Sequence, residues 1–292
     1  MRSCSPCQSS PSRTPHPQDH PRPGDGGRGP APLWVVGLGP GDASLLPPLA
    51  RDALSRAQAV VGYGTYLDLV PPELLEGKTI VETPMRQERA RAEAAVDHAQ
   101  HGTATAVVSS GDAGIYGMAG LILETMERRG CHEQIPWEVI PGIPALAAAA
   151  ARLGAPLTHD FAVISLSDLL TPEETIRRRL LAAAQGDFVT VLYNPCSTRR
   201  TTLLPEALRI LAAHRPQTTP VGFVRNAYRH GETMWTSTIA HATAHGVDMR
   251  TIVLVGSSSS RMVGPRILTP RGYYPAASPR EKIPVDSRDG AL

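Results

Sequence analysis

The chain has 292 residues, of which 41% are hydrophobic and 4% aromatic, and this length suits two α/β domains of ordinary size. Its formal net charge is +2, and residues 1–32 account for the excess because they hold four arginines and two acidic residues. The neutral remainder argues against nucleic acid as a partner, since phosphate binding needs a dense cationic face. We find no apolar run long enough for a bilayer and no secretory signal, so we predict a cytoplasmic protein without a membrane partner.

Both ends of the chain are poor in aliphatic residues. Residues 1–32 are rich in Pro, Ser, Gly and Arg, and such a segment buries too little apolar surface to repay its ordering entropy. We therefore expect a disordered extension or a misassigned start at 1–32 and a mobile tail at 275–292. Cys4 and Cys7 form a CxxC pair without a second half-site, so we predict no bound metal.

The first half of the folded region alternates short apolar runs with helical patterns. Residues 86–100, with their charges and alanines, predict a helix that faces solvent. This alternation indicates an α/β domain with a largely parallel sheet. The predicted strands are Leu33–Val36, Ala59–Val61, Thr105–Val108 and Trp137–Ile140.

The second half continues with four more strands and a helix. Thr171 is predicted to cap that helix, with Pro172 at its first position and Glu174 closing a capping box. Hairpin-like segments around 225–240 suggest mixed strand pairing. We place the domains at 33–141 and 142–274. The predicted strands are Phe161–Leu166, Phe188–Tyr193, Pro220–Arg225 and Thr251–Val255.

A glycine-rich loop, Gly37–Asp42, directly follows the first predicted strand. Its glycines permit positive φ and close approach of a ligand to the backbone. The loop has neither the GxGxxG spacing of a dinucleotide site nor the Gly-Lys-Ser/Thr of a phosphate loop, and Pro40 removes one donor. In isolation the loop predicts an ordinary tight turn as readily as a ligand site.

A second polar loop, Ser109–Gly117, follows the third predicted strand. Ligands of open α/β sheets bind at the carboxyl ends of strands. Ser110, Gly111 and Asp112 there offer a hydroxyl, bare backbone and a carboxylate, which suits an ammonium, a sulfonium or a ribose hydroxyl. The alternative is a helix entry capped by Asp112.

Three further strand ends carry polar groups. Asn194 and Asn226 can each either hydrogen-bond a polar ligand or form an Asx turn. For each asparagine considered alone, the Asx turn is the favoured interpretation. The last predicted strand ends in Gly256–Ser260. No GxSxG elbow occurs, so a serine hydrolase is disfavoured.

Together these segments resemble the tetrapyrrole methylase family, from about Leu33 to Tyr273. The resemblance implies two α/β domains with S-adenosylmethionine bound in the cleft between them, a homodimer and a small-molecule tetrapyrrole substrate. One departure is the Gly256–Ser260 run, where the family has Gly-Asn-Ser-x-Thr. The stretches that carry the resemblance are Val61–Tyr66, Met85–Glu88, Ser109–Gly120, Leu153–Pro172, Asp187–Arg200, Val224–Arg229 and Thr269–Tyr273.

The resemblance is strongest to the branch that methylates precorrin-3B at C17 and contracts the ring to precorrin-4 in cobalamin biosynthesis. S-adenosylmethionine is then the methyl donor and S-adenosylhomocysteine the product. Alternatives within the family are methylation of another corrin position or of cobalt-factor III, and a diphthine synthase. A non-enzymatic ligand-binding protein and a nucleotide-binding oxidoreductase are alternatives from other classes.

The resemblance also implies site residues. Ring contraction needs an acid or base, for which the candidates are Asp42, Ser109 and His159. His159 is either a general acid oriented by Asp160 or an ordinary histidine, and the second interpretation is slightly favoured. Arginines at 86, 199, 200 and 225 are candidates for pairing with the substrate's carboxylates. The implied cofactor contacts are Pro40, Ser110, Gly111, Asp112, Ile115, Pro144, Ala145, Asn194, Ala227 and Gly256.

Overall fold

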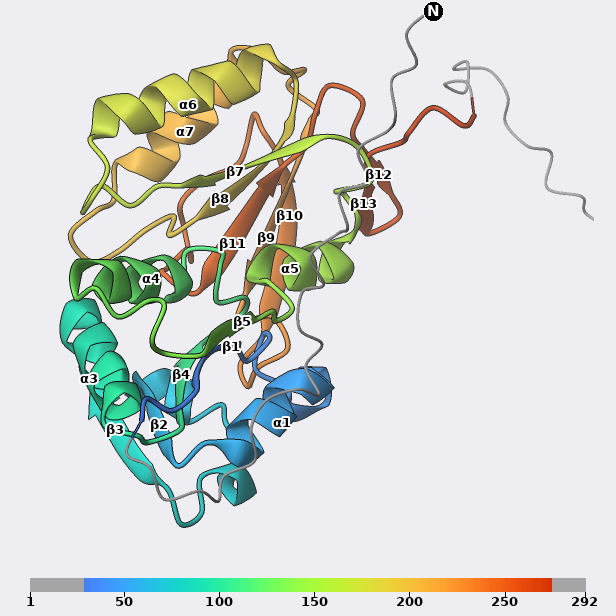
Figure 1. The fold of residues 1–292 in the computed structure, drawn as a ribbon. Coiled ribbons are helices and arrows are strands. Elements are labelled where there is room, and N and C mark those ends of the chain that lie inside the picture. Colours follow the sequence, from blue (N-terminus) through green and yellow to red (C-terminus); the bar gives the residue numbers. More distant parts are fainter. Residues whose placement is uncertain (1–28, 275–292) are drawn as a thin grey trace, which may run out of the picture.

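The computed structural model describes residues 29–274. The chain forms two five-stranded sheets in succession, which lie one above the other in Figure 1. The predicted tail at 275–292, the first 28 residues of the predicted extension at 1–32, and the Cys4–Cys7 pair lie outside the described residues.

The first sheet is parallel throughout, as predicted. It has the order β3-β2-β4-β1-β5. The pattern of apolar runs missed β3, an edge strand whose side chains are largely exposed. The strands are β1 (Leu33–Gly37), β2 (Ala59–Tyr63), β3 (Thr79–Thr83), β4 (Thr105–Ser109) and β5 (Trp137–Ile140).

Alternating side chains of β1 reach the two faces of this sheet, because successive strand residues point in opposite directions. Trp34 and Val36 join the core cluster that includes α1 (Pro48–Arg56). Leu33 and Val35 join the other cluster, with α3 (Glu88–Gln100) and α4 (Ala119–Arg128). The helices that follow the neighbouring strands β1 and β4 therefore cover opposite faces, and such a switch point opens a crevice at the carboxyl ends of the strands.

The second sheet is mixed, which confirms the pairing suggested by the segments around 225–240. Its order is β10-β9-β11-β8-β7. β7 and β8 are parallel, whereas β11 runs antiparallel to β8 and β9, and β10 antiparallel to β9. The strands are β7 (Phe161–Ser165), β8 (Val189–Tyr193), β9 (Pro220–Arg225), β10 (Thr233–Thr238) and β11 (Thr251–Val255).

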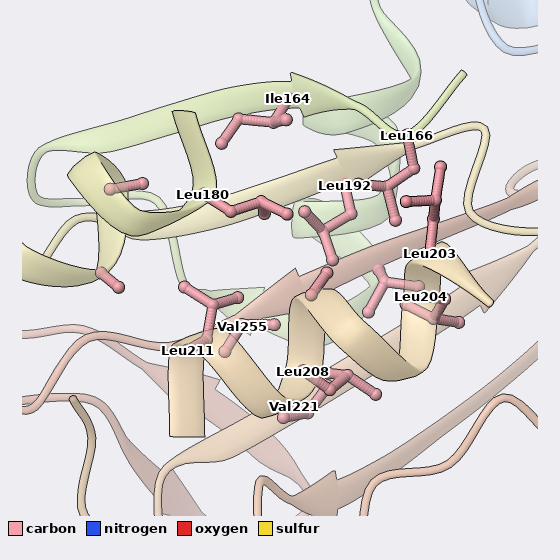
Figure 2. Close-up of a cluster of buried hydrophobic side chains, with 14 of the residues drawn as sticks. Ile164, Leu166, Leu180, Leu192, Leu203, Leu204, Leu208, Leu211, Val221 and Val255 are labelled. Atoms are coloured by element: carbon pink, nitrogen blue, oxygen red, sulfur yellow. The ribbon is translucent and has the colours of Figure 1, made fainter. Parts of the chain in front are cut away.

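Helices cover both faces of the second sheet. Figure 1 shows α6 (Glu173–Gln185) and α7 (Leu203–Ala212) on the outer face, with α5 (Ala145–Leu153) on the face turned toward the first sheet. In Figure 2 the leucines of α6 and α7 meet strand side chains such as Leu192 and Val255 in one apolar cluster. The alanine-rich α5 packs on the inner face.

The predicted cap of α6 is wrong. The helix begins at Glu173, Pro172 occupies the N-cap position, and no side chain caps it. Pro172 has an extended backbone, with ψ of 139°, so it ends the preceding loop and leaves Thr171 too early to reach the first helical N–H groups.

Short elements complete the described chain. They include a small sheet of the order β12-β13-β6. No helix within residues 29–274 is both long and apolar enough to cross a membrane. The short elements are η1 (Ala43–Leu45), α2 (Gly64–Leu67), η2 (Pro72–Leu74), β6 (Gly154–Ala155), β12 (Arg261–Val263) and β13 (Arg266–Leu268).

Truncation of Leu204 tests the core in Figure 2. Leu204 on α7 is fully buried, so Leu204→Ala should lower the free energy of unfolding by about 2–5 kcal/mol. Leu170, which is 97% exposed, provides the matched control. Leu170→Ala should change the free energy of unfolding by less than about 0.5 kcal/mol. Urea denaturation measures both, and equal midpoints for the two variants would contradict this packing.

Candidate functional site

Three strand-end loops of the first sheet meet backbone to backbone. Gly39 and Gly111 form an isolated bridge, with N···O distances of 2.7 and 3.0 Å. A Cβ on Gly142 would lie 2.1 Å from the carbonyl oxygen of Gly111, and one on Gly37 would lie 2.6 Å from the nitrogen of Gly142. Only glycine fits at these contacts. The loops after β1, β4 and β5 can converge because the residues that meet there have no side chain.

Asp112 fastens this junction. Its Oδ1 accepts a hydrogen bond from the Gly114 N–H at 2.8 Å, and its Oδ2 accepts one from the Gly142 N–H at 3.0 Å. The alternative of Asp112 as a helix cap is wrong, because α4 begins at Ala119 with Met118 at the N-cap. The carboxylate instead links the β4 loop to the β5 loop.

The two nearest catalytic candidates have different surroundings. Ser109 is buried and its Oγ accepts a hydrogen bond from the Met118 N–H at 3.2 Å, so it shapes the loop. Asp42 is exposed and accepts bonds from the N–H and hydroxyl of Ser44, at 2.8 and 2.6 Å. These bonds hold the pKa of Asp42 below its ordinary value, which keeps an ionised carboxylate beside a hollow of about 510 Å³.

The start of α5 lies against the glycine junction. A Cβ on Gly111 would stand 3.4 Å from the nitrogen of Ala145 and 3.7 Å from the Cα of Pro144. Pro144 is the N-cap of α5 and Ala145 its first residue. The structure therefore brings these three cofactor candidates together at a helix end, whose first N–H groups lack partners within the helix.

Aromatic contacts extend the site to the second sheet. Tyr116, the neighbour of the exposed candidate Ile115, donates a hydrogen bond to the carbonyl of Val163 on β7 at 3.3 Å. Its ring centroid lies 5.1 Å from that of Tyr193, and the Tyr193 hydroxyl accepts a bond from the Leu146 N–H at 2.9 Å. Burial raises the pKa of Tyr193 to about 12, so this hydroxyl stays protonated.

The two asparagines occupy tight turns at the same edge of the second sheet. Asn194 and Asn226 have φ of 51° and 52°, values that asparagine tolerates better than most residues. Asn194 Nδ2 donates to Ser165 Oγ at 2.9 Å, which ties the ends of β7 and β8 together. Ala227 packs beside the cluster of α5.

Gly256 and His159 lie at the opposite edge of the second sheet from the other candidates. Because β11 is antiparallel, Val255 pairs with Thr190 near the start of β8, and Thr251 is the β11 residue at the site edge. His159 precedes β7 and lines a separate hollow with Asp187 and other residues. We therefore do not retain Gly256 as a cofactor contact or His159 as a general acid.

Two of the four candidate substrate arginines already have acidic partners. Arg200 pairs with Asp168 at 3.1 Å, and Arg225 pairs with Asp248 at 2.8 Å. These ion pairs already balance the charge of both arginines, so we do not retain them as candidates for substrate carboxylates. Arg86 and Arg199 are exposed.

One further arginine joins the two halves of the chain. Arg229, in the loop after β9, donates from Nε to the carbonyl of Pro40 and from Nη2 to the hydroxyl of Ser110. Burial lowers its pKa. The Val224–Arg229 stretch had marked the loop, but nothing in the pattern distinguished this arginine from Arg225.

These groups suit a small polar ligand with an organic cation or hydroxyls. The glycine cradle at 37, 111 and 142 leaves no room for side chains, and backbone groups, hydroxyls and the half-buried Asp112 surround it. These groups can orient a small molecule that binds beside the junction.

Comparisons with known proteins agree on one family. The model of the tetrapyrrole (corrin/porphyrin) methylases matches residues 32–243. A cobalt-factor III methyltransferase of Priestia megaterium is 45% identical over 82% of this chain, which spans 45% of that relative's length. A probable cobalt-factor III C(17)-methyltransferase of Salmonella typhimurium is 44% identical over 82% of this chain and 99% of its own. A precorrin-3B C(17)-methyltransferase of Sinorhizobium sp. is 39% identical over 84% of this chain and 98% of its own length.

Solved structures give the same fold. The methyltransferase CobJ is 39% identical, with a TM-score of 0.77, over 83% of this chain and 100% of its own. A uroporphyrin-III C-methyl transferase from Thermus thermophilus, complexed with S-adenosyl homocysteine, is 25% identical with a TM-score of 0.58. This match covers 77% of this chain and 96% of that chain.

Substitution of Gly142 tests the junction. Gly142→Ala places a Cβ 2.1 Å from a backbone oxygen, so it should lower the free energy of unfolding by about 3 kcal/mol. Gly120 in α4 has open space around the position of a Cβ, and Gly120→Ala should instead stabilise by about 0.5–1 kcal/mol. Thermal melts compare the two, and an unchanged melt for Gly142→Ala would contradict the close contact.

Proposed function

We propose, from the premise that the chain belongs to the tetrapyrrole methylase family, that it methylates precorrin-3B at C17. The reaction uses S-adenosylmethionine and contracts the ring to precorrin-4, in cobalamin biosynthesis. The observation that carries this proposal is the 39% identity to a named precorrin-3B C(17)-methyltransferase along nearly its whole length, combined with the glycine-lined site at the switch point of the first sheet.

The cofactor would be held mainly by backbone and small side chains at the glycine junction. When bound, it supplies a methyl group activated by a sulfonium, so the protein contributes mainly orientation and a dry site. The first sheet and its loops contribute most of the contacts, and α5 and two loops of the second sheet complete them. The residues we propose are Pro40, Ser110, Gly111, Asp112, Ile115, Pro144, Ala145, Asn194 and Ala227.

Among the catalytic candidates we retain Asp42 as the proton acceptor. Its exposed carboxylate lines the hollow of about 510 Å³, a position from which it can take a proton or balance positive charge that develops on the ring. Ser109 acts indirectly, because its hydroxyl oxygen holds the Met118 N–H.

Methylation of cobalt-factor III is the second candidate function. It is favoured by the higher identities, 45% and 44%, to relatives named for that substrate. The names of the relatives give C(17) as the methylated carbon for both substrates.

We also propose a cytoplasmic homodimer with domains at 33–141 and 142–274. The first sheet ends at Ile140 and α5 packs on the second sheet, which supports the boundary. The homodimer is what the family resemblance implies, and the location is the one predicted from the sequence.

Methyl transfer can be tested directly on both substrates. With S-adenosylmethionine, mass spectrometry should show one added methyl on precorrin-3B or cobalt-factor III, and the spectrum of a contracted ring. Asp42→Asn should lower kcat by about 100-fold or more, while Asp52→Asn, which alters an exposed acid on α1 paired with Arg56, should leave it unchanged. If neither substrate gains a methyl, the proposed function is wrong.

A further inference from the structure

Arg229 is a half-buried cation without an acidic partner. Its two hydrogen-bond acceptors, Pro40 O and Ser110 Oγ, are uncharged. Among residues 29–274 no carboxylate lies within ion-pair distance of it, and the charged or titratable groups that influence it are Tyr66 and Arg250. Neutral acceptors bind Nε and Nη2 but leave the half-buried charge uncompensated, which is costly in the absence of a counter-ion.

Neighbouring arginines of the second half do not share this feature. Arg152, on the wall of the same hollow, pairs with Glu232 at 2.9 Å. Arg225, four residues before Arg229, pairs with Asp248. The fold thus supplies acids to these neighbouring arginines and not to Arg229.

The guanidinium of Arg229 is also fixed in place. It lies against Gly41, where a Cβ would stand 2.8 Å from its Nε, and the two loops of the first half hold Nε and Nη2. No residue between 29 and 274 accepts a hydrogen bond from Nη1, and Arg229 lines the hollow of about 510 Å³ that also contains Asp42. A guanidinium held this way can receive an anion without further ordering.

We propose that Arg229 is the receptor for a carboxylate of the bound small molecule. This inference rests on the proposed function, under which two molecules bring carboxylates to the site. One source is the amino-acid end of S-adenosylmethionine, and the other is the ring of acetate and propionate side chains on the tetrapyrrole. Either gives a planar anion that an arginine binds through two hydrogen bonds.

Arg229→Gln tests the proposal, because glutamine removes the charge and keeps an N–H donor. Three probes are titrated by calorimetry: S-adenosylhomocysteine, its decarboxylated analogue, and uroporphyrin as a tetrapyrrole polycarboxylate. The variant should bind one carboxylate probe about tenfold or more weakly and the decarboxylated analogue unchanged. Arg209→Gln, at an exposed arginine on α7, is the control and should bind all three like the wild type.

The outcomes separate the two sources and the two proposals. A loss confined to S-adenosylhomocysteine assigns Arg229 to the cofactor carboxylate, and a loss confined to uroporphyrin assigns it to the tetrapyrrole. Unchanged affinity for both overturns the inference, whereas a wild type that binds neither contradicts the proposed function. If Arg229→Gln does not fold, Arg229→Lys is measured instead, and it should weaken the same probe by a smaller factor because it keeps the charge.

Discussion

The contact among three glycine backbones is the constraint on which the candidate site depends. Gly37, Gly111 and Gly142 end or follow three strands of one sheet, and no side chain fits between them. Asp112 then bonds across the contact to Gly142. Since Gly142 directly precedes the turn into α5, the same contact places the start of α5 beside the β4 loop and so joins the second half of the chain to the first.

Strand direction explains which strand ends reach this junction. Parallel strands carry all their carboxyl ends to one edge, so the loops after β1, β4 and β5 meet there. In the second sheet β7, β8 and β9 share a direction, and β11 opposes it. The end of β11 therefore points away from the site and its beginning points toward it. Thr251 thus occupies the edge at which Gly256 had been expected.

The hydrophobic pattern predicted eight strands because each contains a short run of apolar residues. It did not define β3 or β10, in which one residue or none is buried. It also could not give strand direction, so Gly256 was expected at the wrong edge of the second sheet. His159 was misplaced for a related reason, since a residue that precedes a parallel strand lies at the far edge. The acidic partners of the arginines could not be predicted from the sequence either. Asp168 is 32 residues from Arg200 and Asp248 is 23 residues from Arg225, so only the fold brings each pair together.

The two aspartates of the glycine loops differ in function because their donors differ. Asp112 accepts from N–H groups 2 and 30 residues away, so its oxygens are used to hold two loops at a fixed distance. Asp42 accepts only from Ser44 in its own turn, and its carboxylate is exposed at the hollow that Arg229 lines. An acid and an unpaired arginine on the same wall give the hollow both signs of charge. A protein with little net charge can therefore present local charge of both signs to a ligand at this hollow.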